Sequence, residues 1–143
     1  MKRICFIVDS IFSIGGVQRV TAVIAKELAK DYDVTILTFD SIDKKDVSLY
    51  GLDEVDIHFQ FFSYPSVGYL WNKLCKAYSG YYQRYRPESK IASNLYAHSS
   101  FPYPLRNALT KKLNEGNYDI IIGVHAPLAG RLATMKKKLH GAK

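Results

Sequence analysis

The feature that most constrains the fold is a pair of apolar runs that flank an amphipathic segment. Residues 3–9, RICFIVD, and 34–39, VTILTF, are short, nearly continuous in apolar character and rich in β-branched and aromatic residues. Strands that are buried on both faces have this composition, and they belong to parallel sheets. Residues 17–30 predict a helix, because apolar residues recur there at three- and four-residue spacing. Its apolar stripe is formed by Val17, Val20, Ile24 and Leu28.

The rest of the chain continues the alternation of strands and helices. Further strands are predicted at 55–60 and 118–124, and further helices at 66–86, 104–115 and 127–139. Residues 40–54 are acidic and are predicted to form a loop. The order predicts an α/β fold, a Rossmann-like open and mostly parallel sheet with helices on both faces. We expect residues 1–143 to form a single domain, with ligands at the carboxyl ends of the strands.

Composition excludes several classes of protein. The chain is 48% hydrophobic and 23% charged, which is typical of globular proteins and too apolar for disorder. No apolar run approaches the length of a membrane helix, and the N-terminal residues do not have the pattern of a signal peptide. A cytoplasmic location is therefore expected. Cys5 and Cys75 indicate buried thiols in a reducing compartment. The four histidines lack the spacing of metal ligands, and neither a metal nor a cofactor is expected.

Charge is unevenly distributed along the sequence. Residues 1–70 carry 7 Lys and Arg against 10 Asp and Glu, whereas residues 71–143 carry 13 against 3. The basic half is either an ordinary solvated surface or a face for a phosphorylated substrate, an anionic lipid or a nucleic acid. No DNA or RNA motif is present, so no nucleic-acid partner is expected. The helix predicted at 66–86 combines Trp71 and several tyrosines with lysines and arginines, which suits either a core helix or a helix on an anionic membrane.

The loop after the first strand contains two adjacent glycines, in the stretch FSIGGVQRV from Phe12 to Val20. The loop matches neither the GxGxxG dinucleotide motif nor the GxxxxGK[ST] phosphate loop. Glycines permit positive φ and close approach of the backbone. A helix that begins at Val17 also presents unpaired N–H groups, which suit a phosphate or diphosphate. From these residues alone, Gly15 and Gly16 are either a tight turn or a ligand contact.

The basic first strand, the short polar loop, GGVQRV, the Ala-rich helix and YDVTILTF together resemble the opening of a retaining GT-B glycosyltransferase of family 4. A second segment, YDIIIGVHAPLAGRLA, is similar to a later strand of that family, which runs into a histidine-containing loop. The resemblance covers about residues 1–40 and 116–139. It implies transfer of a sugar, with retention, from a nucleotide-sugar donor to an acceptor hydroxyl, in the synthesis of polysaccharides, glycolipids or surface glycans.

The resemblance also implies roles for particular residues. Gly15, Gly16 and Val17 would contact the donor diphosphate and sugar, and His125 would lie at the reacting centre. The candidates on the side of a glycan or lipid-linked acceptor are Asp9, Ser10, Trp71 and Tyr103. A peripheral contact with the inner face of the cell membrane fits such an acceptor.

The chain departs from the family in one respect. The family's second domain, which grips the nucleotide with a Glu-x7-Glu motif, has no counterpart in these residues. We therefore expect the chain to be the N-terminal, acceptor-side domain, which would be inactive alone. The alternative is a non-enzymatic Rossmann-like module that binds a nucleotide or phosphate.

Overall fold

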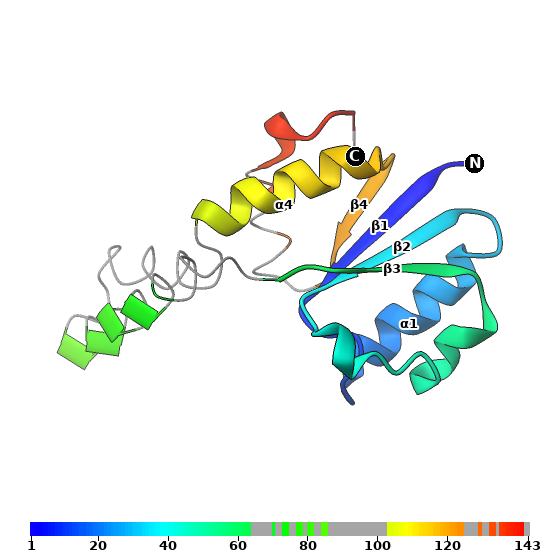
Figure 1. The fold of residues 1–143 in the computed structure, drawn as a ribbon, viewed down its shortest axis with the longest axis horizontal. Helices are drawn as coiled ribbons and strands as arrows, with labels where there is room; N and C mark the ends of the chain where they lie inside the picture. Colours follow the sequence, from blue (N-terminus) through cyan, green and yellow to red (C-terminus); the bar gives the residue numbers. More distant parts are fainter. Residues whose placement is uncertain are drawn as a thin grey trace. The chain divides into compact units, whose positions relative to one another are not determined.

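The structure is a computed structural model, shown in Figure 1. It describes residues 1–63, 70, 73–74, 77–78, 80–81, 84–85, 103–124, 129, 132–133 and 135–141. The chain divides into two compact units. The first contains Met1–Ser63 and Lys112–Lys143, and the second contains Tyr64–Lys111.

A four-stranded parallel sheet forms the centre of the first unit. Its strands are β1 (Arg3–Val8), β2 (Asp33–Thr38), β3 (Ile57–Phe61) and β4 (Ile120–Gly123). They lie in the order β3-β2-β1-β4, so that β1 lies between β2 and β4, two strands that are far apart in the sequence. All neighbouring strands are parallel. The predicted α/β fold, with an open parallel sheet, is confirmed.

The helices agree in part with the predicted segments. Among the described residues, two long helices are α1 (Gly16–Leu28) and α4 (Tyr103–Gly116), close to the predicted 17–30 and 104–115. The region 40–54, predicted as a loop, contains the short 3-10 helices η1 (Ile42–Lys44) and η2 (Leu49–Glu54). In the segment predicted as the last helix, the described residues Ala129, Leu132, Ala133 and Met135 are helical, and η3 (Lys136–Lys138) follows them. Much of the helix predicted at 66–86 lies outside the described residues.

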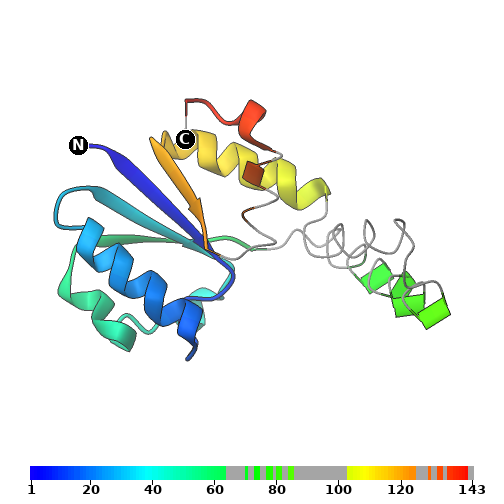
Figure 2. The ribbon, with the colours of Figure 1, turned by 180° about the vertical axis from the view of Figure 1, so that it is seen from behind.

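Helices lie on both faces of the sheet. In Figures 1 and 2, α1 covers one face, while the C-terminal turn of α4, residues 112–116, lies on the other. The face toward α1 buries alternate strand residues together with small residues of the helix. These are Ile4, Phe6, Val8, Val34, Ile36, Ala22 and Ala25. The other face buries Cys5, Ile7 and Leu37. Strands with both faces covered explain why the two apolar runs are continuous.

The apolar stripe of α1 is not the side of the helix that packs on the sheet. Val17, Val20 and Ile24 are 44%, 58% and 45% exposed, and Leu28 is half-buried. The buried residues of α1 are instead Thr21, Ala22 and Ala25. Short side chains at these positions let the helix lie close to the strands, and the branched residues are left beside the contact.

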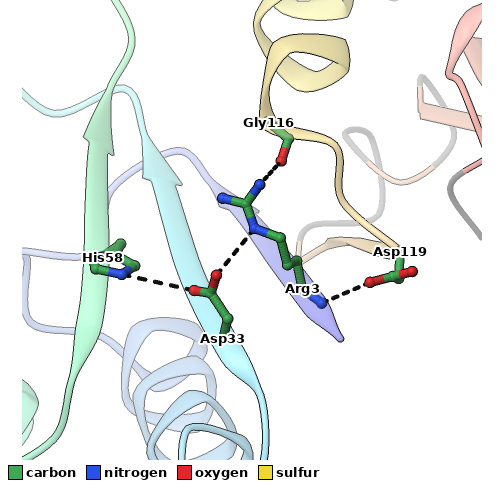
Figure 3. Close-up of polar contacts among 5 residues, drawn as sticks. All are labelled: Arg3, Asp33, His58, Gly116 and Asp119. Carbon is green, nitrogen blue, oxygen red and sulfur yellow. Dashed lines mark hydrogen bonds and ion pairs between the residues drawn. The ribbon is translucent and has the colours of Figure 1, made fainter. Parts of the chain in front are cut away.

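Arg3 joins three segments at the amino end of β1 (Figure 3). Its Nε atom lies 3.0 Å from Oδ2 of Asp33 on β2. Its Nη1 atom donates a hydrogen bond to the carbonyl of Gly116, and its backbone N–H donates to Oδ2 of Asp119 over 2.8 Å. His58 on β3 lies 3.8 Å from the other oxygen of Asp33. These contacts fix the end of the sheet that lies opposite the glycine loop.

Candidate functional site

The site lies at the carboxyl ends of β1 and β4, which are neighbours in the sheet. Ile7 pairs with Gly123 across these strands, and the N–H of Val124 donates to the carbonyl of Ile7 over 3.1 Å. From β1 the chain passes through residues 9–15, the glycine loop, into α1. The two segments that carry the family resemblance therefore meet at one edge of the sheet.

A cavity of about 410 Å³ lies between these two segments. It is lined by Gly16, Val17, Val20, Thr21 and Ile24 of α1, by Phe6, and by Ile122, Gly123 and Val124 at the end of β4. The lining is mainly apolar, with backbone groups at the glycine end. The cavity thus extends from the start of α1 to the residue before His125.

A second cavity, of about 640 Å³, lies beside the glycine loop. It is lined by Ile14, Gly15, Gly16, Arg19, Val23 and Tyr50. Arg19 is an exposed cation one turn into the helix. Gly16 lines both cavities, so it occupies the junction between them.

Neither glycine is required by the backbone conformation. Gly15 has φ −176° and ψ 162°, an extended conformation that any residue adopts. A Cβ atom on Gly15 would first meet the end of the flexible Gln18 side chain. A Cβ atom on Gly16 would have no neighbour within 4 Å. Neither glycine therefore has the positive φ that would require glycine, and the space over Gly16 is open.

The N-terminus of α1 has no side-chain cap. Gly15 occupies the cap position, no side chain bonds there, and the first turn has no acidic residue. The first helical hydrogen bond runs from the N–H of Arg19 to the carbonyl of Gly15 over 3.1 Å. The N–H groups of the first turn precede this bond, and together with the helix dipole they give this end a partial positive charge.

Asp40, just after β2, anchors the first half of the glycine loop. Its Oδ2 atom accepts hydrogen bonds from the N–H groups of Ile11 and Phe12, at 2.8 and 3.2 Å, and from the hydroxyl of Thr38 at 2.9 Å. Partial burial raises the pKa of Asp40, but the hydrogen bonds from Ser10, Phe12, Ile11 and Thr38 outweigh it and lower the pKa. The carboxylate therefore stays charged and holds the loop against the sheet.

Tyr50, in η2, anchors the second half of the loop. Its hydroxyl lies 3.0 Å from both the carbonyl oxygen of Ser13 and the N–H nitrogen of Gly15. Sequence reasoning missed both Asp40 and Tyr50, because they lie 28 to 37 residues from their loop partners. The only sequence signal was their position in the segment that follows the second strand.

The predicted site residues are described to different extents. Asp9 is exposed at the end of β1, and Ser10 is half-buried, with its hydroxyl oxygen 3.0 Å from that of Ser13. Tyr103 begins α4, but its side chain lies outside the described residues. His125 and Trp71 also lie outside them. The structure therefore brings Gly15, Gly16 and Val17 together with the strand that leads to His125.

The described residues contain neither a metal-binding cluster nor a membrane-spanning helix. No group of three or more His, Cys, Asp or Glu side chains in the described part of the chain is arranged to hold a metal ion. Among the same residues, no helix is both long and apolar enough to cross a membrane.

Comparisons with protein-family models, with curated proteins and with solved structures found no match to the chain.

Proposed function

We propose that the chain is the N-terminal, acceptor-side domain of a retaining GT-B glycosyltransferase of family 4. The reaction is transfer of a sugar from a nucleotide-sugar donor to a hydroxyl of a glycan or lipid-linked acceptor. The observation that carries the proposal is Gly16. This residue starts an uncapped helix, has open space over its Cα atom, and lies where two cavities meet at the carboxyl edge of a parallel sheet. The backbone conformation does not require glycine at this position. A ligand that approaches the backbone closely would explain why no side chain is present.

The chemistry of the amide groups suits the leaving group of this reaction. As the bond between the sugar and the diphosphate breaks, negative charge develops on the diphosphate. N–H groups of Gly16 and Val17, fixed at the positive end of α1, would stabilise that charge without reorganising. His125 would orient the donor sugar beside them. The second domain would hold the nucleotide, so the 143-residue chain is expected to bind the donor weakly and to lack turnover.

A residue-resolved binding experiment tests the donor site. The ¹⁵N-labelled chain is titrated with UDP-glucose, GDP-mannose and ADP-glucose while its amide resonances are followed by NMR. We expect one of these donors to shift the amides of Gly16 and Val17 in a saturable way. The amides around Arg3, at the far end of β1, serve as internal controls and should not move. If each donor at about ten millimolar leaves the amide resonances of residues 15–17 unchanged, the dissociation constant lies above the range of even weak ligands. That outcome would reject the donor site.

The same titration separates the enzyme from its alternative. Inorganic diphosphate and the free nucleotide are added in parallel experiments. A glycosyltransferase domain should respond to the sugar, because the end of β4, the strand that leads to His125, would form the sugar side of the proposed site. A response of equal size and pattern to inorganic diphosphate alone would favour the phosphate-binding module.

We further propose that the second unit contacts an anionic membrane. The described residues of the segment predicted as helix 66–86 are helical, and several large apolar side chains on them are exposed. These are Leu70, Leu74, Tyr78, Tyr81 and Tyr85. They recur at three- and four-residue spacing, and aromatic residues of this kind suit the membrane interface.

Vesicle sedimentation tests the membrane contact. The chain should co-sediment with vesicles that contain about a third phosphatidylglycerol and remain free with pure phosphatidylcholine. The double variant Leu74→Glu, Tyr78→Glu should lose this binding, whereas the exposed pair Val20→Glu, Val23→Glu on α1 controls for added negative charge. Equal binding by the two double variants would reject the proposed surface.

A further inference from the structure

We propose that Tyr50 is a positioning residue of the glycine loop, which fixes Ser13–Gly15 so that the N–H groups of Gly16 and Val17 are presented to the diphosphate of a nucleotide sugar. The identity of the ligand rests on the proposed function, whereas the contact between Tyr50 and the loop is observed in the structure.

One hydroxyl group holds the loop on both sides of residue 14. The Tyr50 hydroxyl donates to the carbonyl of Ser13 and accepts from the N–H of Gly15, each over 3.0 Å. The carbonyl of Gly15 lies further away, at 3.4 Å from the same oxygen. The side chain of Ile14, between the two held residues, is 92% exposed and contributes little packing of its own. The hydrogen bonds to Tyr50 therefore fix a part of the loop that side-chain packing leaves free.

The contact also sets which N–H groups face a ligand. The N–H of Gly15 is occupied by the phenol oxygen, so the first free amides of the row are those of Gly16 and Val17. Tyr50 lines the larger cavity together with Gly15, Gly16 and Arg19. Tyr50 thus borders the proposed ligand space together with Gly16.

The backbone at Tyr50 is held in an uncommon conformation that aims the ring at the loop. Tyr50 has φ 63° and Gly51 has φ 65°, so two successive residues are left-handed. This region is rarely populated by an aromatic residue and persists only where neighbours hold it. Lys26 of α1 contacts this segment: its Nζ atom lies 3.5 Å from the carbonyl of Tyr50 and 2.6 Å from Oε2 of Glu54. The helix that starts in the glycine loop therefore also contacts the residue that fixes the loop.

The arrangement matters for binding because a fixed row of amides loses less entropy when an anion binds than a mobile row does. Removing the Tyr50 hydroxyl should weaken binding of the ligand while the amides of Gly16 and Val17 stay in place. A positioning role also predicts an effect in the ligand-free chain, where the N–H of Gly15 should lose its protection against hydrogen exchange. A direct contact with the ligand does not predict this effect, so the ligand-free measurement separates the two roles.

The test compares Tyr50→Phe with the wild-type chain. Tyr32→Phe is the matched control, because it also removes one phenol oxygen from a half-buried tyrosine. Hydrogen exchange of the Gly15 amide is measured first, without ligand. We expect it to accelerate roughly fivefold in Tyr50→Phe, the effect of one hydrogen bond, and to stay unchanged in Tyr32→Phe. The titration with UDP-, GDP- and ADP-sugars is then repeated. We expect the dissociation constant of the donor that binds to rise roughly fivefold in Tyr50→Phe only.

Exchange of the β1 and β2 amides reports whether each variant keeps its fold, so a loss of binding is assigned to the loop only when these amides stay protected. Unchanged exchange of Gly15 in Tyr50→Phe overturns the positioning role, and so does an unchanged dissociation constant. If no donor shifts the wild-type amide resonances, the proposed function is overturned. The proposal that Tyr50 positions the loop for a diphosphate is then overturned with it. The wild-type titration therefore tests the function, and the variant tests Tyr50.

Discussion

Gly123 and Ala129 lie so close together that a Cβ atom on the glycine would be 2.9 Å from the Cα atom of the alanine and 3.0 Å from its nitrogen. Both obstacles are backbone atoms, which cannot rotate away as a side chain can. The helical segment after β4 therefore approaches the strand at a position where any side chain would push it off. Gly123 is required by this packing, in contrast to Gly16.

Gly123→Ala should destabilise the protein by about 1–3 kcal/mol, the cost of forcing an extra group into a packed contact. The free energy of unfolding is measured by urea titration, followed by circular dichroism. Gly16→Ala is the matched control. Its Cβ atom enters open space in the first turn of a helix, so stability should stay equal or rise by up to about 1 kcal/mol. A loss of similar size in both variants would show that the close approach at Gly123 has no energetic consequence.

Gly16→Val should remove the donor response while the fold survives. The valine side chain would occupy the open space over Gly16, where the ligand is proposed to approach. Valine is somewhat more favourable than glycine in a helix, so the urea midpoint should stay equal or rise slightly. In the NMR titration with nucleotide sugars, we expect the amide of Val17 to stop responding. A valine variant with the wild-type response would reduce Gly16 to a residue with no part in binding.

Asp40 should make stability depend on pH on the acidic side. Hydrogen bonding lowers the pKa of this carboxyl below its ordinary value of 3.8, so the folded state binds its proton less readily than the unfolded state does. The stabilisation is therefore fully present above pH 3.8 and is lost as the pH falls through the lowered pKa. The measurement is a series of urea unfolding curves from pH 7 down to pH 3.

Asp40→Asn provides the comparison for that series. The amide keeps one acceptor oxygen but loses the charge, so we expect a loss of about 1–2 kcal/mol at pH 7. The difference between wild type and variant should shrink as the pH approaches 3. A difference that stays constant over the whole range would contradict a role for the charged carboxylate.

The thiol of Cys5 should be inert in the folded protein. Burial raises its pKa from 9.0 to about 12, against smaller lowering effects of Leu37, Tyr118 and Arg3. A rise of three units reduces the thiolate fraction by about 10³ at a given pH, and the thiolate is the reactive form. In a Cys75→Ser variant, which leaves Cys5 as the single thiol, labelling by DTNB at pH 8 should be slower by on the order of 10³ than in 6 M guanidinium chloride. Rapid labelling without denaturant would show that this face of the sheet opens readily.

The strands were predictable because their chemistry is local. The runs 3–9 and 34–39 are apolar on both faces, and they became β1 and β2 with boundaries shifted by one residue at most. The meeting of the glycine loop with the end of β4 was also predictable, since parallel strands share a carboxyl edge. That edge follows from the order of elements alone.

The contacts that shape the loop were not predictable. The apolar spacing of Val17, Val20 and Ile24 marks a helix but does not say which side packs, and here the small residues Ala22 and Ala25 do. Tyr50 carries no local signal of its left-handed backbone, and its contacts are with α1 and the loop, far away in the sequence. The hydrogen bonds of Asp40 likewise depend on the pairing of β1 and β2, because Asp40 follows β2 whereas Ile11 and Phe12 follow β1.

The ion pair between Arg3 and Asp33 lies at the amino end of β1. The amides of Gly16 and Val17 lie beyond the other end of this strand, at the start of α1. At the rise of a parallel strand, these ends are roughly 17 Å apart, about twice the screening length at physiological ionic strength. A charge gained or lost at Arg3 is therefore hardly felt in the glycine loop. Mutation can therefore change stability at one end of the strand and the proposed ligand binding at the other end as two separate traits.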